Sequence, residues 1–192
     1  MLGEVLVFLR SRLDGYMSAR LGVVPGEADQ AKVVLLDGEK ADPIEFQMGA
    51  VTALLINIEQ EKIQRAPDRF YRIRPDGTSE RVNPEVRINL YVLFVARFKQ
   101  YEQGLDYLSL IIQYFQGHSL IDRSSAPELD ARIDKLSFEL VTLSLSEQGE
   151  IWNALRTSYT PSVMYRVGLL IFQDEDSISG PEVAEKVIGV SQ

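Results

Sequence analysis

The chain has 192 residues, of which 45% are apolar and 25% charged, a composition typical of a globular domain long enough to bury its own core. Twenty basic and twenty-eight acidic residues leave a formal charge of −8, which disfavours general binding to nucleic-acid phosphates. Cysteine is absent, which excludes disulfide frameworks, thiolate metal sites and cysteine nucleophiles.

Apolar residues recur at helical spacing from Leu2 to Met17, and this pattern predicts an amphipathic helix of about five turns. Arg10 and Arg12 interrupt the apolar run that a secretion signal would need. No stretch approaches the roughly 18 consecutive apolar residues of a membrane helix. We therefore expect a soluble protein that is cytoplasmic on synthesis and has no membrane partner.

Three strands are predicted in the first half of the chain, at residues 31–36, 51–65 and 86–98. In the second of these, Leu54, Ile56 and Ile58 fall on one side. The third has one continuous apolar face, and its other face turns from polar to apolar, which is typical of a central strand.

Residues 66–84 lie between two of these strands and are rich in charge, proline and turn dipeptides. Loops of this length in compact domains tend to be functional or disordered. We interpret the segment as a long β-hairpin whose tip projects from the body; the alternative is a surface loop without a partner.

The second half predicts a heavily buried helix at 101–117, with Leu105 and Phe115 among its inward residues. A polar connection follows, and then a strand at 135–145 whose change of phase indicates a bulge or burial on both faces. Ser146 is predicted to cap a short helix that carries Trp152. A last strand is predicted at 163–172.

This order of elements lacks the strict alternation of a doubly wound fold. It predicts an α+β fold with a mostly antiparallel sheet and flanking helices, occupying residues 1–172. Residues 173–192 form an acidic C-terminal tail that we expect to be flexible or ordered by a partner.

Residues suited to catalysis are nearly absent from the sequence. His118 is the single histidine and follows a predicted helix end, so neither a catalytic triad nor a two-histidine metal site can be built around it. The acidic run at 173–177 lacks the spacing of a calcium loop and is interpreted as a solvated charge run. We assign no catalytic, cofactor-binding or metal-binding residue, and we do not expect an enzyme.

Two blocks of sequence resemble the tail-terminator, or cap, family of phage-tail-like contractile injection systems. The first is "VNPEVRINLYVLFVARFKQYEQGLDYLSLIIQYFQG" (82–117), and the second runs from "KLSFELVTLSLSEQGEIW" into "NALRTSYTPSVMYRV" (135–167). The family's second block carries a tryptophan in the short helix and a Tyr-x-Pro-Ser-x-x-Tyr run. Here these are Trp152 and the run from Tyr159 to Tyr165, which we interpret as a corner of the core and not as a ligand pocket.

The resemblance implies a phage tail-terminator-like fold and a structural role. Members of the family form a ring, thought of as six subunits, that ends the inner tube and attaches to the last layer of the contractile sheath. The implied partners are therefore the chain itself, the tube protein and the sheath protein, within a particle that is released or anchored. Two alternatives stay open: a neck or head–tail connector ring protein of a phage-like particle, and a small-ligand-binding α+β domain.

We expect contacts with partners in the two segments that look too long and polar to serve the fold. The hairpin would reach a neighbouring subunit or the tube, and the tail would donate a strand to the sheath from "VAEKVIGV". The candidate contact residues are Arg69, Tyr71, Arg72, Arg74, Asp76, Arg81 and Asn83 in the hairpin, and Val183, Val187 and Ile188 in the tail.

Overall fold

The structure is a computed structural model that describes residues 2–21, 31–38, 44–61, 71–73, 79–81 and 86–171. Its helices are α1 (Leu2–Leu21), α2 (Tyr101–Gly117) and α3 (Leu145–Ala154). Its strands are β1 (Val33–Leu35), β2 (Ala50–Gln60), β3 (Tyr71–Ile73), β4 (Ser79–Arg81), β5 (Val86–Arg97), β6 (Leu120–Asp122), β7 (Ile133–Val141) and β8 (Ser162–Ile171). The fold is α+β, as predicted.

Six strands form one sheet in the order β1-β2-β5-β8-β7-β6, while β3 and β4 pair only with each other. Every neighbouring pair is antiparallel except β1 and β2. The predicted, mostly antiparallel sheet is thus confirmed, and β5 is the central strand that its sequence indicated.

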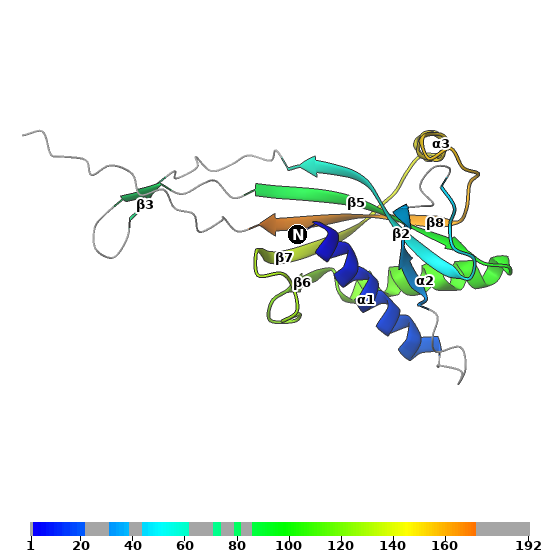
Figure 1. Cartoon of the computed structure of the whole chain (residues 1–192), viewed down its shortest axis with the longest axis horizontal. Coiled ribbons are helices and arrows are strands. Elements are labelled where there is room, and N and C mark those ends of the chain that lie inside the picture. The colour runs from blue at the N-terminus through cyan, green and yellow to red at the C-terminus, as the bar shows by residue number, and fades with distance from the viewer. Residues whose placement is uncertain are drawn as a thin grey trace, which may run out of the picture.

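Helices α1 and α2 lie together on one face of the sheet, and α3 lies on the other (Figure 1). The first face holds the larger core, which contains inward residues of both long helices and of β5, β7 and β8. Alternation along β5 divides its side chains between the layers, with Leu90, Val92 and Phe94 on the α1–α2 side and Leu93 and Val95 on the α3 side.

Aromatic rings fill the centre of the larger core. The Phe115 ring of α2 lies with its centroid 5.9 Å from that of Phe94, 4.6 Å from Phe138 and 4.5 Å from Tyr165. These four side chains come from α2, β5, β7 and β8, so the cluster joins one helix to three strands. Burial also raises the pKa of the Tyr165 hydroxyl, because ionisation is disfavoured away from water.

The smaller core lies under α3 and is built around Trp152. The Trp152 ring meets Phe46 edge-on with centroids 6.0 Å apart, and it packs with the sheet residues Leu93, Val95 and Met164. The prediction that Trp152 is a core residue is confirmed. The prediction that Trp152 and the run from Tyr159 to Tyr165 form one corner of the core is wrong for Tyr165, which belongs to the core on the opposite face.

A β-bulge in β2 changes which residues share a face. The register with β5 shifts between Leu55 and Asn57, so Ile58 pairs with Leu90. Because directly paired residues point to the same side, Ile58 lies on the α1–α2 side, whereas Ile56 packs toward α3. The predicted common face of Leu54, Ile56 and Ile58 is therefore wrong at Ile58.

Helix α2 has the predicted bounds, but one of its predicted inward residues is exposed. Phe115 is buried, whereas Leu105 retains 41% of its accessible surface. The inward stripe is made instead by Gly104, Tyr107, Leu108, Ile111 and Tyr114 together with Phe115. A Cβ atom at Gly104 would lie 3.6 Å from the Ala96 and Phe98 side chains, which is ordinary van der Waals contact, so Gly104 packs directly on the end of β5.

The segment that was expected to be a polar connection contains a short edge strand, β6, which pairs with β7 from Leu120↔Ser137 to Asp122↔Lys135. Strand β7 begins earlier and ends earlier than predicted. Its bulge lies at its start, between Ile133 and Lys135, and not in the middle of the strand.

Helix α3 begins two residues earlier than predicted. Ser144, not Ser146, is the N-cap: its hydroxyl accepts a hydrogen bond from the Glu147 backbone N–H, and its own N–H donates to the Glu147 carboxylate at 2.8 Å. This is a capping box. The Glu147 carboxylate also accepts a hydrogen bond from the Ser144 hydroxyl at 2.7 Å, and this bond, followed by the one from the Ser144 N–H, lowers the pKa of Glu147.

We expect Ser144→Ala to lower the free energy of unfolding by about 1 kcal/mol, because it removes the acceptor for a helix-terminal N–H group. Ser146→Ala is the matched control and should be nearly neutral, since Ser146 lies within the helix, where alanine is favoured. Urea denaturation of the two variants distinguishes these expectations. Equal losses in both variants would contradict the assigned cap.

Candidate functional site

The predicted hairpin is present where the structure describes it. Tyr71 pairs with Arg81 and Arg72 with Glu80 in an antiparallel ribbon. In Figure 1 the β3 strand lies well apart from the six-stranded sheet. The two strands therefore extend away from the cores described above.

Only some of the predicted contact residues lie in the part of the chain that the structure describes. Tyr71, Arg72 and Arg81 lie in β3 and β4, where the backbone is described. The rest of the set lies outside the described residues: Arg69, Arg74, Asp76, Asn83, Val183, Val187 and Ile188. Their contacts with partners stay a prediction.

His118 has a structural role at the end of α2. Its Nδ1 lies 2.8 Å from the Tyr114 carbonyl oxygen, and its ring stacks on the Tyr114 ring at a centroid distance of 4.4 Å. Within the described ranges, no three histidine, cysteine or acidic side chains gather where they could hold a metal ion. No helix in this part of the chain is long and apolar enough to cross a membrane.

The two outer edges of the sheet are only partly covered. Strand β1 pairs with β2 only from Val51 to Ala53, and β6 pairs with β7 only up to Ser137. Among the described strands, none pairs with the outer side of β2 from Leu54 onward or of β7 beyond Phe138. These stretches present backbone N–H and C=O groups at opposite sides of the molecule, and such edges can accept strands from other chains.

Apolar side chains are also exposed near α3. Leu145, at the start of the helix, is 87% exposed, and Tyr159 is 57% exposed while its ring contacts Trp152 at a centroid distance of 5.6 Å. The core around the buried Trp152 is thus continuous with an exposed apolar surface. Exposed apolar surface of this kind can mark a protein contact.

The sheet face that carries α3 is hollowed away from that helix, toward the other end of β5 and β8. The hollow has a volume of about 350 Å³ and is lined by residues of β5, β7 and β8. Most of its polar lining residues lie on three cross-strand rows of backbone pairing: Arg87–Leu170–Lys135, Asn89–Gly168–Ser137 and Tyr91–Arg166–Glu139. We call this feature the polar hollow.

Gly168 keeps the floor of the polar hollow open. A Cβ atom at this position would lie 2.6 Å from Ser137 Oγ and 3.3 Å from Asn89 Oδ1, so any larger residue would fill the space between them. Asn89 is only 7% exposed, yet its side chain makes no hydrogen bond within the described part of the chain. Its carboxamide lines the hollow and can donate or accept hydrogen bonds there.

The two outer rows of the polar hollow differ in electrostatic character. In one, Arg166 forms an ion pair with Glu139, and the Tyr91 hydroxyl donates to Glu59 at 2.8 Å, which raises the pKa of Tyr91. In the other, Arg87 and Lys135 are exposed, and neither forms an ion pair with another described residue. The end of the hollow nearest the exit of β8 is thus cationic.

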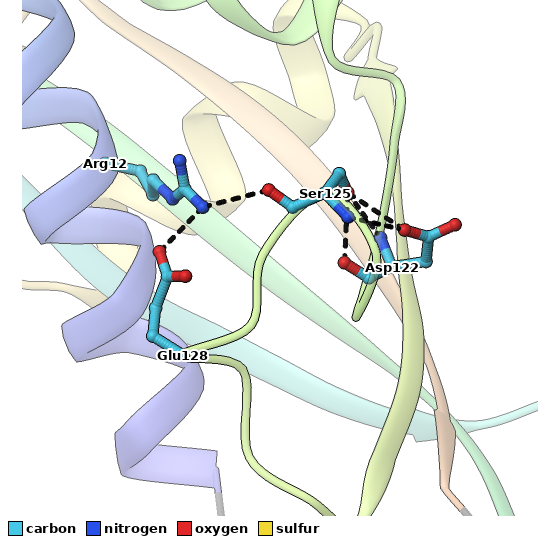
Figure 2. A network of polar contacts seen from close by, with 4 residues as sticks. All are labelled: Arg12, Asp122, Ser125 and Glu128. Carbon is cyan, nitrogen blue, oxygen red and sulfur yellow. Dashed lines mark hydrogen bonds and ion pairs between the residues drawn. The ribbon is translucent and has the colours of Figure 1, made fainter.

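A second polar network fixes the loop between β6 and β7 beneath α1 (Figure 2). The Arg12 guanidinium pairs with the Glu128 carboxylate at 2.6 Å and donates to the Ser125 carbonyl oxygen at 3.3 Å. The Ser125 N–H in turn donates to the Asp122 carboxylate at 2.9 Å. The network holds a loop whose Ala126 side chain is fully buried in the larger core, so its role is structural.

Acid should weaken this network in a defined pH range. Hydrogen bonds from Ser124 and then Ser125 lower the pKa of Asp122 from 3.8 to about 2. Because the folded-state pKa lies below that of the unfolded chain, the carboxylate contributes stability that is present above about pH 4 and lost toward pH 2. We expect Asp122→Asn to lower the urea midpoint near neutral pH, and the difference from the unchanged chain to narrow between about pH 4 and 2. A difference that does not depend on pH would contradict this.

Sequence reasoning missed the polar hollow, because its residues come from three strands far apart in the sequence. The only local signal was the polar start of the 86–98 strand, at Arg87 and Asn89, within an otherwise apolar pattern. Asp14 lies in the predicted first helix, where the sequence alone gives it no role. In the fold its carboxylate accepts hydrogen bonds from the backbone N–H groups of Lys32 and Val33, which ties α1 to β1.

Comparison with known proteins gives a consistent result. The family described as the Pvc16 N-terminal domain matches residues 4–186. Among solved structures, the chain is similar to the PVC sheath/tube terminator of an extracellular contractile injection system, with 17% identity and a TM-score of 0.58. That alignment covers 94% of this chain and 62% of the other, so the chain spans less than two thirds of that protein's length.

A further similarity is to the tube-terminating cap of the anti-feeding prophage, with 16% identity, a TM-score of 0.47 and coverage of 74% of this chain and 48% of that one. No curated protein sequence matches the chain.

Proposed function

The chain belongs to the Pvc16 N-terminal domain family, and from this premise we propose that it acts as a structural cap, or tail terminator, of a contractile injection system. The observation that carries the proposal is the family match over residues 4–186, together with a fold shared along 94% of the chain with a sheath/tube terminator. The proposed partners are the inner tube protein and the contractile sheath protein.

Termination requires a subunit that satisfies an open interface on one side and offers no equivalent interface on the other. A growing helical polymer always has an unsatisfied end, because its contacts are heterologous. We propose that copies of this chain close into a ring, and that the ring is a hexamer. The partly open edges of β2 and β7 support such a ring, because they lie at opposite sides of the sheet and can meet in neighbouring copies.

The ring is tested by the mass of the purified chain in solution and by negative-stain images. The proposal expects closed rings of uniform size, with six copies as the proposed number. A chain that stays monomeric at every concentration, and also in the presence of tube protein, would overturn it. Closed rings that bind a portal in place of a tube would favour a neck or head–tail connector.

We further propose that the segment 66–84 contacts a neighbouring subunit or the tube. Support comes from the β3–β4 ribbon, which pairs within itself and lies apart from the sheet. Arg72 and Arg81 are the test positions, and replacing both by glutamate should weaken ring or tube binding without changing the melting temperature. The control is the same exchange at Arg10 and Lys99, which are exposed on the body of the domain. Equal effects at both pairs of positions would contradict a specific contact.

The C-terminal tail, 173–192, is proposed to donate an extended segment to the sheath, with Val183, Val187 and Ile188 as its apolar contacts. The last described strand, β8, ends at Ile171, and the proposed domain ends one residue later, at 172. A chain lacking 174–192 should therefore fold and form rings but fail to retain sheath. Normal attachment of sheath to particles capped by the shortened chain would refute the role of the tail.

We propose that the chain has no catalytic activity of its own. Its few polar clusters support this, since in the described residues they are ion pairs and loop contacts such as Arg12–Glu128 and Arg166–Glu139. The rival function, a small-ligand-binding domain, is favoured by one observation, the polar hollow. A metabolite that copurifies with the chain and binds this hollow would support the rival.

A further inference from the structure

We propose that the polar hollow is a docking site for the acidic run Asp174, Glu175 and Asp176 of the same chain, which anchors the root of the tail to the open face of the sheet. The occupant is a protein segment with closely spaced carboxylates. This inference concerns the free protein and does not depend on the proposed cap function.

Strand β8 ends beside two cationic residues, Arg87 and Lys135. Leu170 of β8 pairs with Arg87 of β5 on one side and with Lys135 of β7 on the other. Directly paired residues in an antiparallel sheet lie about 5 Å apart, so two cations flank the strand one residue before its end at Ile171. The side chains of Arg87 and Lys135 share the open face, because their neighbours Ile88 and Leu136 belong to the core on the other face.

Chain length is the second argument. Asp174 follows Ile171 by three residues, and an extended chain spans about 3.5 Å per residue, so its carboxylate can reach roughly 10 Å from the strand end. Two residues, Phe172 and Gln173, separate Ile171 from Asp174. A tether this short gives an effective concentration in the millimolar range, so even a contact that is weak between separate molecules is populated.

Complementary chemistry is the third argument. Carboxylates need donors, and the hollow offers the Arg87 guanidinium and the Lys135 ammonium at its rim, with the Ser137 hydroxyl and the Asn89 carboxamide on its floor. The Asn89 side chain is 7% exposed and makes no hydrogen bond within the described residues. Gly168 leaves the space over the floor that an entering side chain would occupy.

Other charges in the hollow set where the carboxylates can lie. Glu139 is held by Arg166 at the end nearer α3, and Glu61 lines the β2 side. Both repel an acidic segment, which leaves the end between Arg87 and Lys135 as the favourable position. The chain as a whole carries a charge of −8, so Arg87 and Lys135, which form no ion pair with another described residue, make this end of the hollow a local exception to its acidic character.

The test is limited proteolysis of the full chain with an endopeptidase that cuts after glutamate. Glu175 lies within the docked run and Glu185 lies further along the same tail, so the second site is an internal reference. We expect cleavage after Glu175 to be roughly fivefold slower than after Glu185 at low salt, and the difference to disappear at about 0.5 M salt, where exposed ion pairs are screened.

Three variants sharpen the test. R87E/K135E should abolish the protection of Glu175, and adding D174K/D176K to it should restore the protection by exchanging the two signs. R10E/K99E, which changes the net charge equally at exposed sites elsewhere, should leave the protection intact. Circular dichroism melting checks that all the variants are folded.

Two results would overturn the proposal. One is equal cleavage after Glu175 and Glu185 in the unchanged chain at low salt. The other is protection that rises with protein concentration, because the run would then dock onto a second copy and not onto its own chain. Neither result bears on ring formation or on tube binding, so failure here leaves the proposed function standing.

Discussion

Replacing Phe115 with alanine is expected to lower the free energy of unfolding by about 3–5 kcal/mol, the largest effect of any single change considered. The Phe115 ring contacts Phe94, Phe138 and Tyr165, which belong to three different strands of the sheet. Its removal leaves a cavity that α2 cannot close without losing its other contacts. The lost stability therefore combines the free energy gained by burying the ring with the cost of the cavity.

The measurement is urea denaturation followed by the fluorescence of Trp152, the only tryptophan, which reports from the opposite face of the sheet. The control is Leu105→Ala in the same helix, where the side chain is 41% exposed and the expected loss is below about 1 kcal/mol. Similar losses in the two variants would mean that α2 does not pack on the face assigned to it.

Trp152→Ala is expected to lower the free energy of unfolding by about 3 kcal/mol, at the lower end of the range for buried aromatic residues. Trp152 is the residue that holds α3 on its face of the sheet, through Phe46 and the β5 residues Leu93 and Val95. The value is at the lower end because this core is smaller and lies near the surface.

The matched control is Tyr159→Ala, which removes an exposed ring that touches the same indole. Its effect on unfolding should be below about 1 kcal/mol, whereas its effect on assembly should be larger if the exposed apolar surface near α3 is a contact with a partner. Circular dichroism replaces fluorescence for the tryptophan variant. A loss in Trp152→Ala no greater than that in Tyr159→Ala would contradict the second core.

Periodicity alone predicted the elements whose burial is uniform along their length. The α1 pattern and the bounds of α2 follow from apolar spacing, because each helix packs on one face of the sheet. The two-faced character of β5 also follows, because its alternating side chains enter the two cores. The α+β class with a mostly antiparallel sheet followed from the order of these elements.

Errors arose where a single residue shifts the register or where two caps compete. The bulge at Ile56 moves Ile58 to the other face, and nothing in an alternating apolar run marks which residue is left unpaired. Ser144 and Ser146 are both acceptable caps, but only Ser144 has a glutamate three residues later to complete a capping box. That spacing was a usable signal.

Less of the candidate site than of the fold could be predicted from the sequence. The polar hollow needs Arg87, Asn89, Lys135, Ser137 and Gly168 to meet across three strands, and their register is set by tertiary pairing and by the bulge at the start of β7. The family, in contrast, was identified from packing motifs that lie within single elements, such as the Leu90–Phe94 run and Trp152.

The central claim is that the chain acts by closing off a polymer, and assembly of tube and sheath with and without it tests this most directly. Particles made with the chain should have a narrow distribution of lengths and should carry one copy of its ring at a single end in electron micrographs. Without it, tubes and sheaths should continue to grow and should separate from each other. Particles of normal length with sheath attached, formed in its complete absence, would contradict the account.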